Sequence, residues 1–395
     1  MTPPEIVYMD HAATTPVHPE VLQAMLPYFT EKFANPSSIY SIAGVTRTAI
    51  EDARAKVAKA IGASPDEIYF TSGGTESDNW AIKGIAYANR KKGNHIITSA
   101  IEHHAVLHTC DYLEKQGFAV TYVPVDKYGV IDLAKLREAI TPQTILITVM
   151  FANNEIGTIE PIAEIGKLAR EKGIYFHTDA VQAVGHVPTD VKALQVDLLS
   201  LSAHKFYGPK GTGALYIRKG VKIDNFMHGG GQEKRKRAST ENVPGIVGLG
   251  KAIELATADI EGTGRRLRAL RERLKDGITT RISHTRYNGH PDRRLPGNVN
   301  ICFEFIEGES LLLLLSQQGI CGSTGSACTS ASLEPSHVLL AIGLPHEIAH
   351  GSLRLTMGDA NTEAEVDYVL EVLPKIVDKL RQMSPLYEKV TKGVC

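Results

Sequence analysis

The sequence has little that would suit a secreted, membrane-bound or nucleic-acid-binding protein. Its 395 residues include only five cysteines, none spaced C-x-x-C, so neither a disulfide framework nor a cysteine-built zinc site is expected. The longest aliphatic run, 311–315, is far shorter than the roughly 20 residues that span a bilayer. Residues 1–10 have no basic region and no apolar signal core, so we expect a cytosolic protein without a membrane partner.

The charges of the chain are balanced. There are 43 Lys and Arg residues against 44 Asp and Glu residues, which gives a formal net charge of −1 at pH 7. No summed field would attract a polyanion, so direct nucleic-acid binding is not expected. The composition is that of an ordinary globular protein, and 395 residues are enough for two or three domains.

Residues 66–220 alternate short apolar segments with helical patterns. Strands are expected at 68–70, 95–98, 120–125, 144–149, 174–176, 197–201 and 214–217. Helices are expected at 75–90, 104–116, 133–140 and 161–172. This alternation predicts an α/β fold with a mostly parallel central sheet and helices on both faces. Ligands of such sheets bind in loops at the carboxyl ends of the strands.

The pattern changes after Pro244. A long charged helix is expected over 246–281, followed by strands at 298–305 and 353–357 and helices at 310–318 and 363–383. This predicts a smaller α+β domain. We expect an N-terminal segment, 1–15, associated with that small domain, a large domain over 16–258, and the small domain over 259–395.

Four polar loops follow predicted strands, at 71–77, 177–182, 200–205 and 322–328. In the first, backbone N–H groups and the Thr75 hydroxyl would form a cup for a phosphate. The alternative is an N-capping role for Ser72 or Thr75. The other loops supply Asp179, Lys205 and, among small residues, Cys328. A Schiff-base lysine, a carboxylate for a pyridinium nitrogen and a phosphate cup are what pyridoxal 5′-phosphate requires.

Longer motifs identify a family that the chain resembles. They are Tyr8-Met9-Asp10-His11-Ala12-Ala13-Thr14-Thr15-Pro16, Asn35-Pro36-Ser37-Ser38, 71–79, Glu102-His103, Asn153-Asn154-Glu155-Ile156-Gly157, 177–182, His204-Lys205, Gly208-Pro209-Lys210-Gly211, 325–330 and Leu333-Glu334-Pro335-Ser336. With these motifs the chain resembles cysteine desulfurases of the NifS/IscS type, which are fold-type I pyridoxal-phosphate enzymes of aminotransferase class V. The resemblance covers nearly the whole chain, and it makes 16–258 the cofactor-binding domain and 259–395 the carrier of the Cys328 loop.

The resemblance implies roles for individual residues. Lys205, His103 and Cys328 would be catalytic: Lys205 as Schiff-base lysine and general base, His103 stacked on the cofactor ring and moving protons, Cys328 as the sulfur-accepting thiol. The cofactor would be held by Gly74, Thr75, Asn154, Asp179, Gln182, Ser202, His204, Lys205 and Thr240. The substrate would be held by Arg354, which clamps its carboxylate, with Asn35 and Asn154.

The resemblance also implies a reaction and partners. L-cysteine would become L-alanine, leaving a persulfide on Cys328 for a sulfur-acceptor protein of iron–sulfur cluster assembly or tRNA thiolation. Thr240 would reach the phosphate in the partner subunit of a homodimer. No resident metal is expected, and Cys328 is the one candidate for transient ligation of an iron–sulfur cluster. Cys321 is interpreted as a buried strand cysteine, with a relay thiol as the alternative.

Other functions remain open at this point. The loop thiol favours desulfuration over selenocysteine lysis or another aminotransferase or lyase reaction of the same cofactor. A non-enzymatic sulfur-carrier scaffold would not need Lys205. The run 346–350 fits the H-E-x-x-H pattern of zinc proteases, but barely one helical turn is available before the strand at 353. His104 and His108 share a helix face without a third ligand, and the basic run 234–237 is interpreted as a solvated loop.

Overall fold

The computed structural model describes residues 6–325 and 335–391. Its centre is a seven-stranded sheet in the order β2-β8-β7-β6-β5-β3-β4. The strands are β2 (Ile68–Thr71), β3 (His95–Ser99), β4 (Ala119–Val123), β5 (Thr144–Thr148), β6 (Tyr175–Asp179), β7 (Leu198–Ser202) and β8 (Gly213–Ile217). Strand β8 pairs antiparallel with both β2 and β7, and the other pairings are parallel. The predicted mostly parallel α/β sheet is therefore confirmed.

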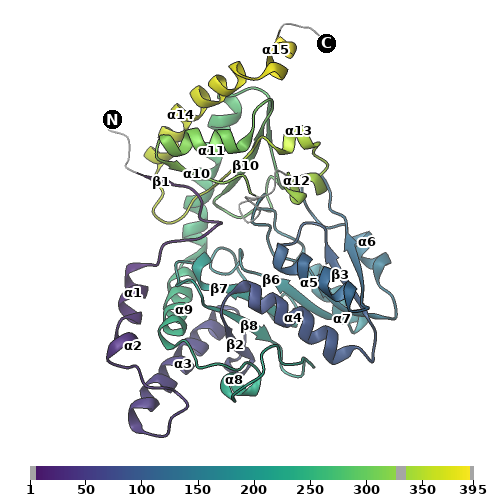
Figure 1. Ribbon diagram of the computed structural model, residues 1–395, viewed down its shortest axis with the longest axis vertical. Helices are drawn as coiled ribbons and strands as arrows, with labels where there is room; N and C mark the ends of the chain where they lie inside the picture. The colour runs from purple at the N-terminus through teal and green to yellow at the C-terminus, as the bar shows by residue number, and fades with distance from the viewer. Residues whose placement is uncertain (1–5, 326–334, 392–395) are drawn as a thin grey trace.

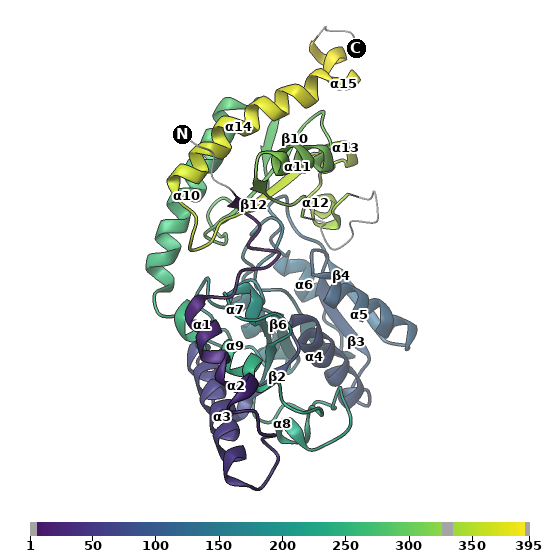
Figure 2. The same ribbon diagram turned by 60° about the vertical axis from the view of Figure 1, so that its left-hand side comes forward.

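Both faces of this sheet are apolar, and each is covered by helices (Figures 1 and 2). Ile96 and Leu146 pack with α4 (Gly74–Asn89) and α5 (His104–Lys115), whereas the next residues, Ile97 and Ile147, belong to the core on the other face. Successive strand residues point to opposite faces, which explains this division. The second face is covered by α1 (Pro19–Met25), α3 (Ser41–Ala60), α6 (Leu133–Ala139), α7 (Ile162–Lys172) and α9 (Val243–Ala256).

A second unit is built from the C-terminal part of the chain and lies at the upper end in Figures 1 and 2. Its antiparallel sheet has the order β12-β10-β9. Strand β1 joins it by pairing parallel with β11, Val7 opposite Ile320, and Val7 and Met9 lie in its core. The remaining elements are β1 (Val7–Tyr8), α10 (Ile260–Arg281), β9 (Thr285–Tyr287), β10 (Asn298–Phe303), α11 (Gly308–Gln317), β11 (Ile320–Cys321), α12 (His337–Ala341), α13 (His346–Ala349), β12 (Ser352–Thr356), α14 (Glu363–Gln382) and α15 (Pro385–Thr391).

The prediction of one long helix over 246–281 is wrong, because the structure has two helices there. Helix α9 ends at Ala256, and α10 begins after Asp259, whose side chain accepts a hydrogen bond from the N–H of Gly262. Such a cap satisfies a backbone donor at the start of a new helix. The helices α1, α2 (Pro27–Thr30) and α3 were not expected from the sequence. No helix in the described ranges is long and apolar enough to cross a membrane.

Candidate active site

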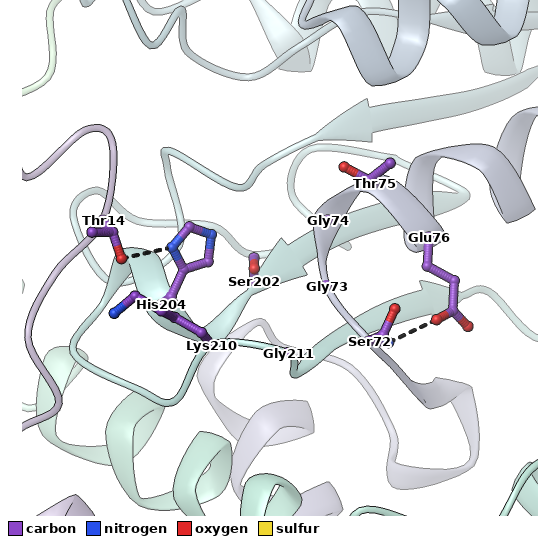
Figure 3. Close-up of a pocket in the computed structure, with 10 residues that line it drawn as sticks. All are labelled: Thr14, Ser72, Gly73, Gly74, Thr75, Glu76, Ser202, His204, Lys210 and Gly211. Carbon is purple, nitrogen blue, oxygen red and sulfur yellow. Dashed lines mark hydrogen bonds between the residues drawn. The ribbon is translucent and has the colours of Figure 1, made fainter. Parts of the chain in front are cut away.

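The strand ends of the large sheet surround one cavity of about 340 Å³ (Figure 3). Strands β2, β6 and β7 are parallel to one another, so Thr71, Asp179 and Ser202 end at the same edge of the sheet. The lining residues are Thr14, Ser72, Gly73, Gly74, Thr75, Glu76, Ser202, His204, Lys210 and Gly211. The location agrees with the rule that ligands of α/β sheets bind beyond the carboxyl ends of the strands.

The turn before α4 forms one wall of the cavity. Gly73 is the N-cap residue with φ +151°, and no side chain caps this helix. The expected alternative, a cap by Ser72 or Thr75, is therefore wrong. A Cβ at position 74 would lie 2.6 Å from Val181 Cγ2, so a larger residue would crowd the turn. Uncapped N–H groups at a helix start suit an anionic ligand.

A carboxylate stands beside this turn, and an arginine neutralises it. Glu76 Oε2 accepts a hydrogen bond from the N–H of Ser72 at 2.8 Å. Arg237 donates to both carboxylate oxygens of Glu76, at 2.7 and 2.9 Å. Burial raises the pKa of Glu76, but the hydrogen bonds from Arg237 and Ser72 outweigh it and hold the pKa below its usual value. The Glu76 carboxylate is thus ionised and paired.

Lys205 follows β7 in a short 3₁₀ turn, η2 (Ala203–Lys205). Its Nζ donates hydrogen bonds to the backbone oxygens of Ala12, at 2.5 Å, and Ala13, at 2.8 Å. Gln182 Nε2 also donates to the oxygen of Ala12, at 3.0 Å. The N-terminal segment therefore lies against the lysine and brings Gln182 beside it. Two carbonyl oxygens can accept hydrogen bonds from one ammonium group.

Asp179 is the last residue of β6, and its side chain is buried. Its Oδ1 accepts a hydrogen bond from the N–H of Val181 at 2.9 Å. Burial raises the pKa of Asp179 to about 6, while that hydrogen bond and the positive charge of Lys205 act to lower it. A buried carboxylate near neutrality is suited to pair with a protonated ring nitrogen.

Two histidines flank the lysine. His103 is the N-cap of α5, and its Nδ1 accepts a hydrogen bond from the N–H of Ala105 at 3.1 Å. Burial, together with the charge of Lys205, lowers the pKa of His103 to about 4, so its ring is neutral at pH 7. The Nδ1 atom of His204 is 3.1 Å from Thr14 Oγ1, within hydrogen-bond distance (Figure 3). Burial and Lys205 also lower the pKa of His204 to about 4.

Arg354 lies in β12 and is buried. Its guanidinium donates to Asp10 Oδ1 at 2.8 Å and to the backbone oxygen of Asn154 at 3.1 Å. Its Nε is buried and has no hydrogen-bond partner in the described part of the chain. The backbone of Arg354 also pairs with that of Ser323, with N–O distances of 2.6 and 3.0 Å.

Not all predicted residues converge in this structure. Asn35 lies in the turn between α2 and α3, where its Oδ1 accepts from the N–H of Ser37, and its pairing with Arg354 stays a prediction. Thr240 lines a neighbouring cavity that shares Ser72 and Gly211 with the first. Cys328 lies outside the described residues. Cys321 is interpreted from the sequence as a buried strand cysteine: its place in the strand β11 agrees with this, but it is half-buried and not buried.

The other motifs have structural surroundings of their own. The H-E-x-x-H run forms α13, only His346–Ala349 long, and the rings of His104, His108 and His337 cluster with 5.0 Å between neighbouring centroids. Within the described ranges, no three His, Cys, Asp or Glu residues are placed to hold a metal ion. The basic run 234–237 is partly paired, because Lys234 faces Asp66 and Arg237 binds Glu76.

Some residues of the site were not singled out from the sequence. Asp10 and Thr14 belong to a quoted motif, but only the fold brings them to Arg354 and His204. The carbonyl groups of Ala12 and Ala13 leave no side-chain signal at all. Glu76 could have been suspected from its place in the first helical turn, where carboxylates are common.

Comparisons with known proteins agree with this geometry. The family model for class-V aminotransferases matches residues 7–369. The chain is 68% identical to cysteine desulfurase IscS of Methanosarcina thermophila, over 97% of this chain and 95% of that protein. It is 65% identical to cysteine desulfurase IscS of a Clostridium botulinum strain, over 98% of both. A solved NifS-like protein superimposes with a TM-score of 0.90 at 41% identity, covering 95% of this chain and 100% of that one.

The chain therefore belongs to the class-V aminotransferases, a family of pyridoxal-phosphate enzymes. This assignment confirms the predicted fold class and replaces the zinc-protease and carrier-scaffold alternatives. Within the family it belongs to the cysteine desulfurases of the IscS and NifS type, as the resemblance predicted. A structure described as SspA in complex with cysteine also superimposes on this chain, with a TM-score of 0.79 at 41% identity, covering 89% of this chain and 98% of that one.

Proposed function

We propose that this protein converts L-cysteine to L-alanine and transfers the sulfur, as a persulfide on Cys328, to an acceptor protein. The observation that carries the proposal is the convergence of Lys205, Asp179 and the uncapped start of α4 at one edge of the sheet, with Arg354 held next to Asn154. An acceptor in iron–sulfur cluster assembly or tRNA thiolation would suit this product. Transient ligation of an iron–sulfur cluster by Cys328 belongs to the same proposal.

The residues present fit pyridoxal 5′-phosphate. The start of α4 would take the phosphate, together with Ser202 and His204, which face it across the cavity (Figure 3). Lys205 would hold the aldehyde carbon, Asp179 the ring nitrogen, and Gln182 the ring hydroxyl. Asn154 and Thr240 are the remaining proposed contacts. When bound, the cofactor withdraws electrons from the substrate Cα and makes its hydrogen acidic.

The substrate carboxylate would bind Arg354. This guanidinium is fixed on one side by Asp10 and on the other by the oxygen of Asn154. A guanidinium binds a carboxylate through two parallel hydrogen bonds, which also sets the orientation of the amino acid. The unpartnered Nε of Arg354 is one donor that a carboxylate could use. Asn35 is proposed as a further contact.

Proton movements would be carried by Lys205 and His103. Lys205 takes the Cα proton, because its amine is the group assigned to the aldehyde carbon and is therefore next to the substrate Cα. His103 is neutral at pH 7 and can accept a proton from the substrate or return one. The Cys328 thiolate then attacks the substrate sulfur: an S–S bond forms, the C–S bond breaks with its electron pair left on carbon, and protonation gives alanine.

A homodimer is part of the proposal. The segment around α1, α2 and the start of α3 exposes many large apolar side chains, which in a monomer would be unfavourable. Ile39, for instance, is 98% exposed. A second copy of the chain could cover these side chains. Such a dimer agrees with the proposal that Thr240 of one subunit reaches the cofactor phosphate in the other. The exposed side chains are Leu22, Leu26, Phe29, Phe33, Ile39, Tyr40, Ile42 and Val45.

The dimer can be tested at a single position. Ile39→Asp should shift the molecular mass by light scattering from dimer toward monomer, because it places a charge in the covered surface. Leu313→Asp is the matched control, since Leu313 is 67% exposed on α11. A monomeric wild type, or equal effects of both substitutions, would contradict the dimer.

The reaction is tested by its products. The purified protein should show a visible absorbance band of bound cofactor and should form alanine from L-cysteine, with sulfide released when dithiothreitol is added to reduce the persulfide. Lys205→Ala should lose alanine formation, whereas the exposed Lys219→Ala should keep it. Selenocysteine lysis is the second candidate within the family, and activity on selenocysteine with none on cysteine would favour it.

A further inference from the structure

A layer of polar side chains is buried between α4 and the sheet, behind Asp179. Residues His177 and Asp179 of β6 point to the α4 side, because Phe176, the residue before His177, packs in the opposite core and successive strand residues alternate in direction. Thr148 of β5 and Ser200 of β7 flank His177, with side-chain distances of 2.8 Å to its Nδ1 and 3.0 Å to its Nε2. All of these side chains are buried.

Asp78 of α4 completes this layer. It is 1% exposed, and its Oδ1 lies 3.6 Å from His177 Nε2. Ser200 also acts on it as a hydrogen-bonding neighbour. Asp78 Oδ1 has no hydrogen-bond partner in the described part of the chain. An ionised oxygen buried without a donor is strongly unfavourable, whereas a neutral carboxyl group tolerates that position far better.

Two acidic groups therefore share one region of low polarity. Two nearby carboxyl groups in such a place do not both ionise readily. Asp179 has the positive charge of Lys205 close by, which lowers its pKa. Burial, and next the charge of Asp179, raise the pKa of Asp78 well above its usual value, although a hydrogen bond with Ser200 acts to lower it. Burial lowers the pKa of His177 to about 3, so this neighbour is neutral and supplies no compensating charge.

The remaining titratable group that faces Asp78 also favours a neutral state there. Glu102, two residues before α5, acts on Asp78 as a like charge. Burial raises the pKa of Glu102 itself to about 8. The charged groups in this region are thus Asp179 and Lys205, because His177, the ion-pair neighbour of Asp78, is neutral.

We propose that Asp78 is the protonated member of a buried carboxyl pair and positions Asp179 as the charged member. Its hydrogen is donated to Ser200 Oγ, the Ser200 hydroxyl donates to His177 Nε2, and His177 Nδ1–H donates to Thr148 Oγ1. The chain of hydrogen bonds fixes His177, which points to the same face of β6 as Asp179. The proposed pairing of charged Asp179 with a cofactor nitrogen rests on the proposed function. The location of the hydrogen on the Asp78 carboxyl group does not.

The tautomer of His177 reports the charge of Asp78. If Asp78 were ionised, the chain would reverse: Ser200 would donate to Asp78, His177 Nε2–H to Ser200, and Thr148 to His177 Nδ1. ¹⁵N NMR of the histidine-labelled protein distinguishes the two, because a protonated ring nitrogen resonates far upfield of an unprotonated one. His177→Gln assigns the signal. Hydrogen on Nδ1 alone supports the proposal, and hydrogen on Nε2, or on both nitrogens, overturns it.

A second measurement uses the cofactor-loaded protein. Asp78→Asn replaces a neutral acid with a neutral amide, so the pH midpoint of the visible absorbance should move by less than about 0.3 unit. Loss of a real negative charge would move it by more than about one unit. Asp179→Asn is the comparison variant, because it removes the charge that the proposal assigns to the site. Absent cofactor absorbance would contradict the proposed function and leave the His177 measurement unaffected.

Discussion

Arg354 and Asp10, which are 344 positions apart in the sequence, form a partly buried ion pair of 2.8 Å between Nη2 and Oδ1. The pair ties the N-terminal segment to strand β12 at the place where the substrate carboxylate is proposed to bind. The guanidinium is therefore oriented before the substrate arrives. Preorganisation of this kind lowers the cost of binding.

The first prediction concerns this orientation. Arg354→Lys should raise the KM for L-cysteine by about 10- to 100-fold, since it removes the charge-assisted hydrogen bonds that a guanidinium makes in parallel. Steady-state alanine formation measures it. Arg286→Lys, on β9 at the other edge of the same sheet, should leave KM unchanged. An unchanged KM in Arg354→Lys would mean that the substrate carboxylate binds elsewhere.

The pair between Arg237 and Glu76 gives a second prediction. Arg237→Ala leaves the Glu76 carboxylate uncompensated beside the proposed phosphate position, so the dissociation constant of pyridoxal 5′-phosphate should rise about tenfold. Fluorescence titration of the cofactor-depleted protein measures it. Arg235→Ala serves as control, because that exposed arginine forms no ion pair among the described residues. Equal affinities in both variants would contradict the role of the pair.

The third prediction concerns stability against pH. Burial raises the pKa of Glu102 to about 8 from its usual 4.5, while Ser99 and the N–H of Met150 act to lower it. Because the folded pKa is the higher one, its contribution to stability is full below about pH 4.5 and is lost as the pH rises to about 8. Glu102→Gln, which cannot ionise, should remove this loss.

The measurement is chemical unfolding at several pH values. Relative to Glu102→Gln, the wild type should lose about 1.4 kcal/mol of unfolding free energy per pH unit between pH 5 and 8. The exposed Glu138→Gln should run parallel to the wild type over the same range. Parallel curves for wild type and Glu102→Gln would show that Glu102 is ionised in the folded protein.

The central fold was largely predictable, because the sequence patterns that indicate its strands and helices lie within short stretches of the chain. The alternation of β-branched strands with amphipathic helices indicated β3, β5, β6 and β7 and the helices between them. The reversed direction of β8 leaves no mark in a strand pattern. The break between α9 and α10 depends on one capping aspartate, Asp259, inside a continuous charged pattern.

The site was predictable only through long motifs. These gave Lys205, Asp179 and Arg354, whose residue types suit their chemistry. The partners of these residues depend on the tertiary fold: Asp10 reaches Arg354 from the other end of the chain, and backbone oxygens hold Lys205. The cap interpretation of the α4 start was wrong because Gly73, with φ +151°, occupies the capping position.

The most direct test of the account follows the sulfur atom. After one turnover with L-cysteine, the wild type should gain the mass of one sulfur atom on Cys328 and release one equivalent of alanine, by peptide mass spectrometry and amino-acid analysis. Cys321→Ser, the matched control seven positions away, should do the same. Cys328→Ser should keep its cofactor absorbance but carry no added sulfur. Alanine formation by Cys328→Ser at the wild-type rate, or sulfur on another residue, would contradict the proposed persulfide mechanism.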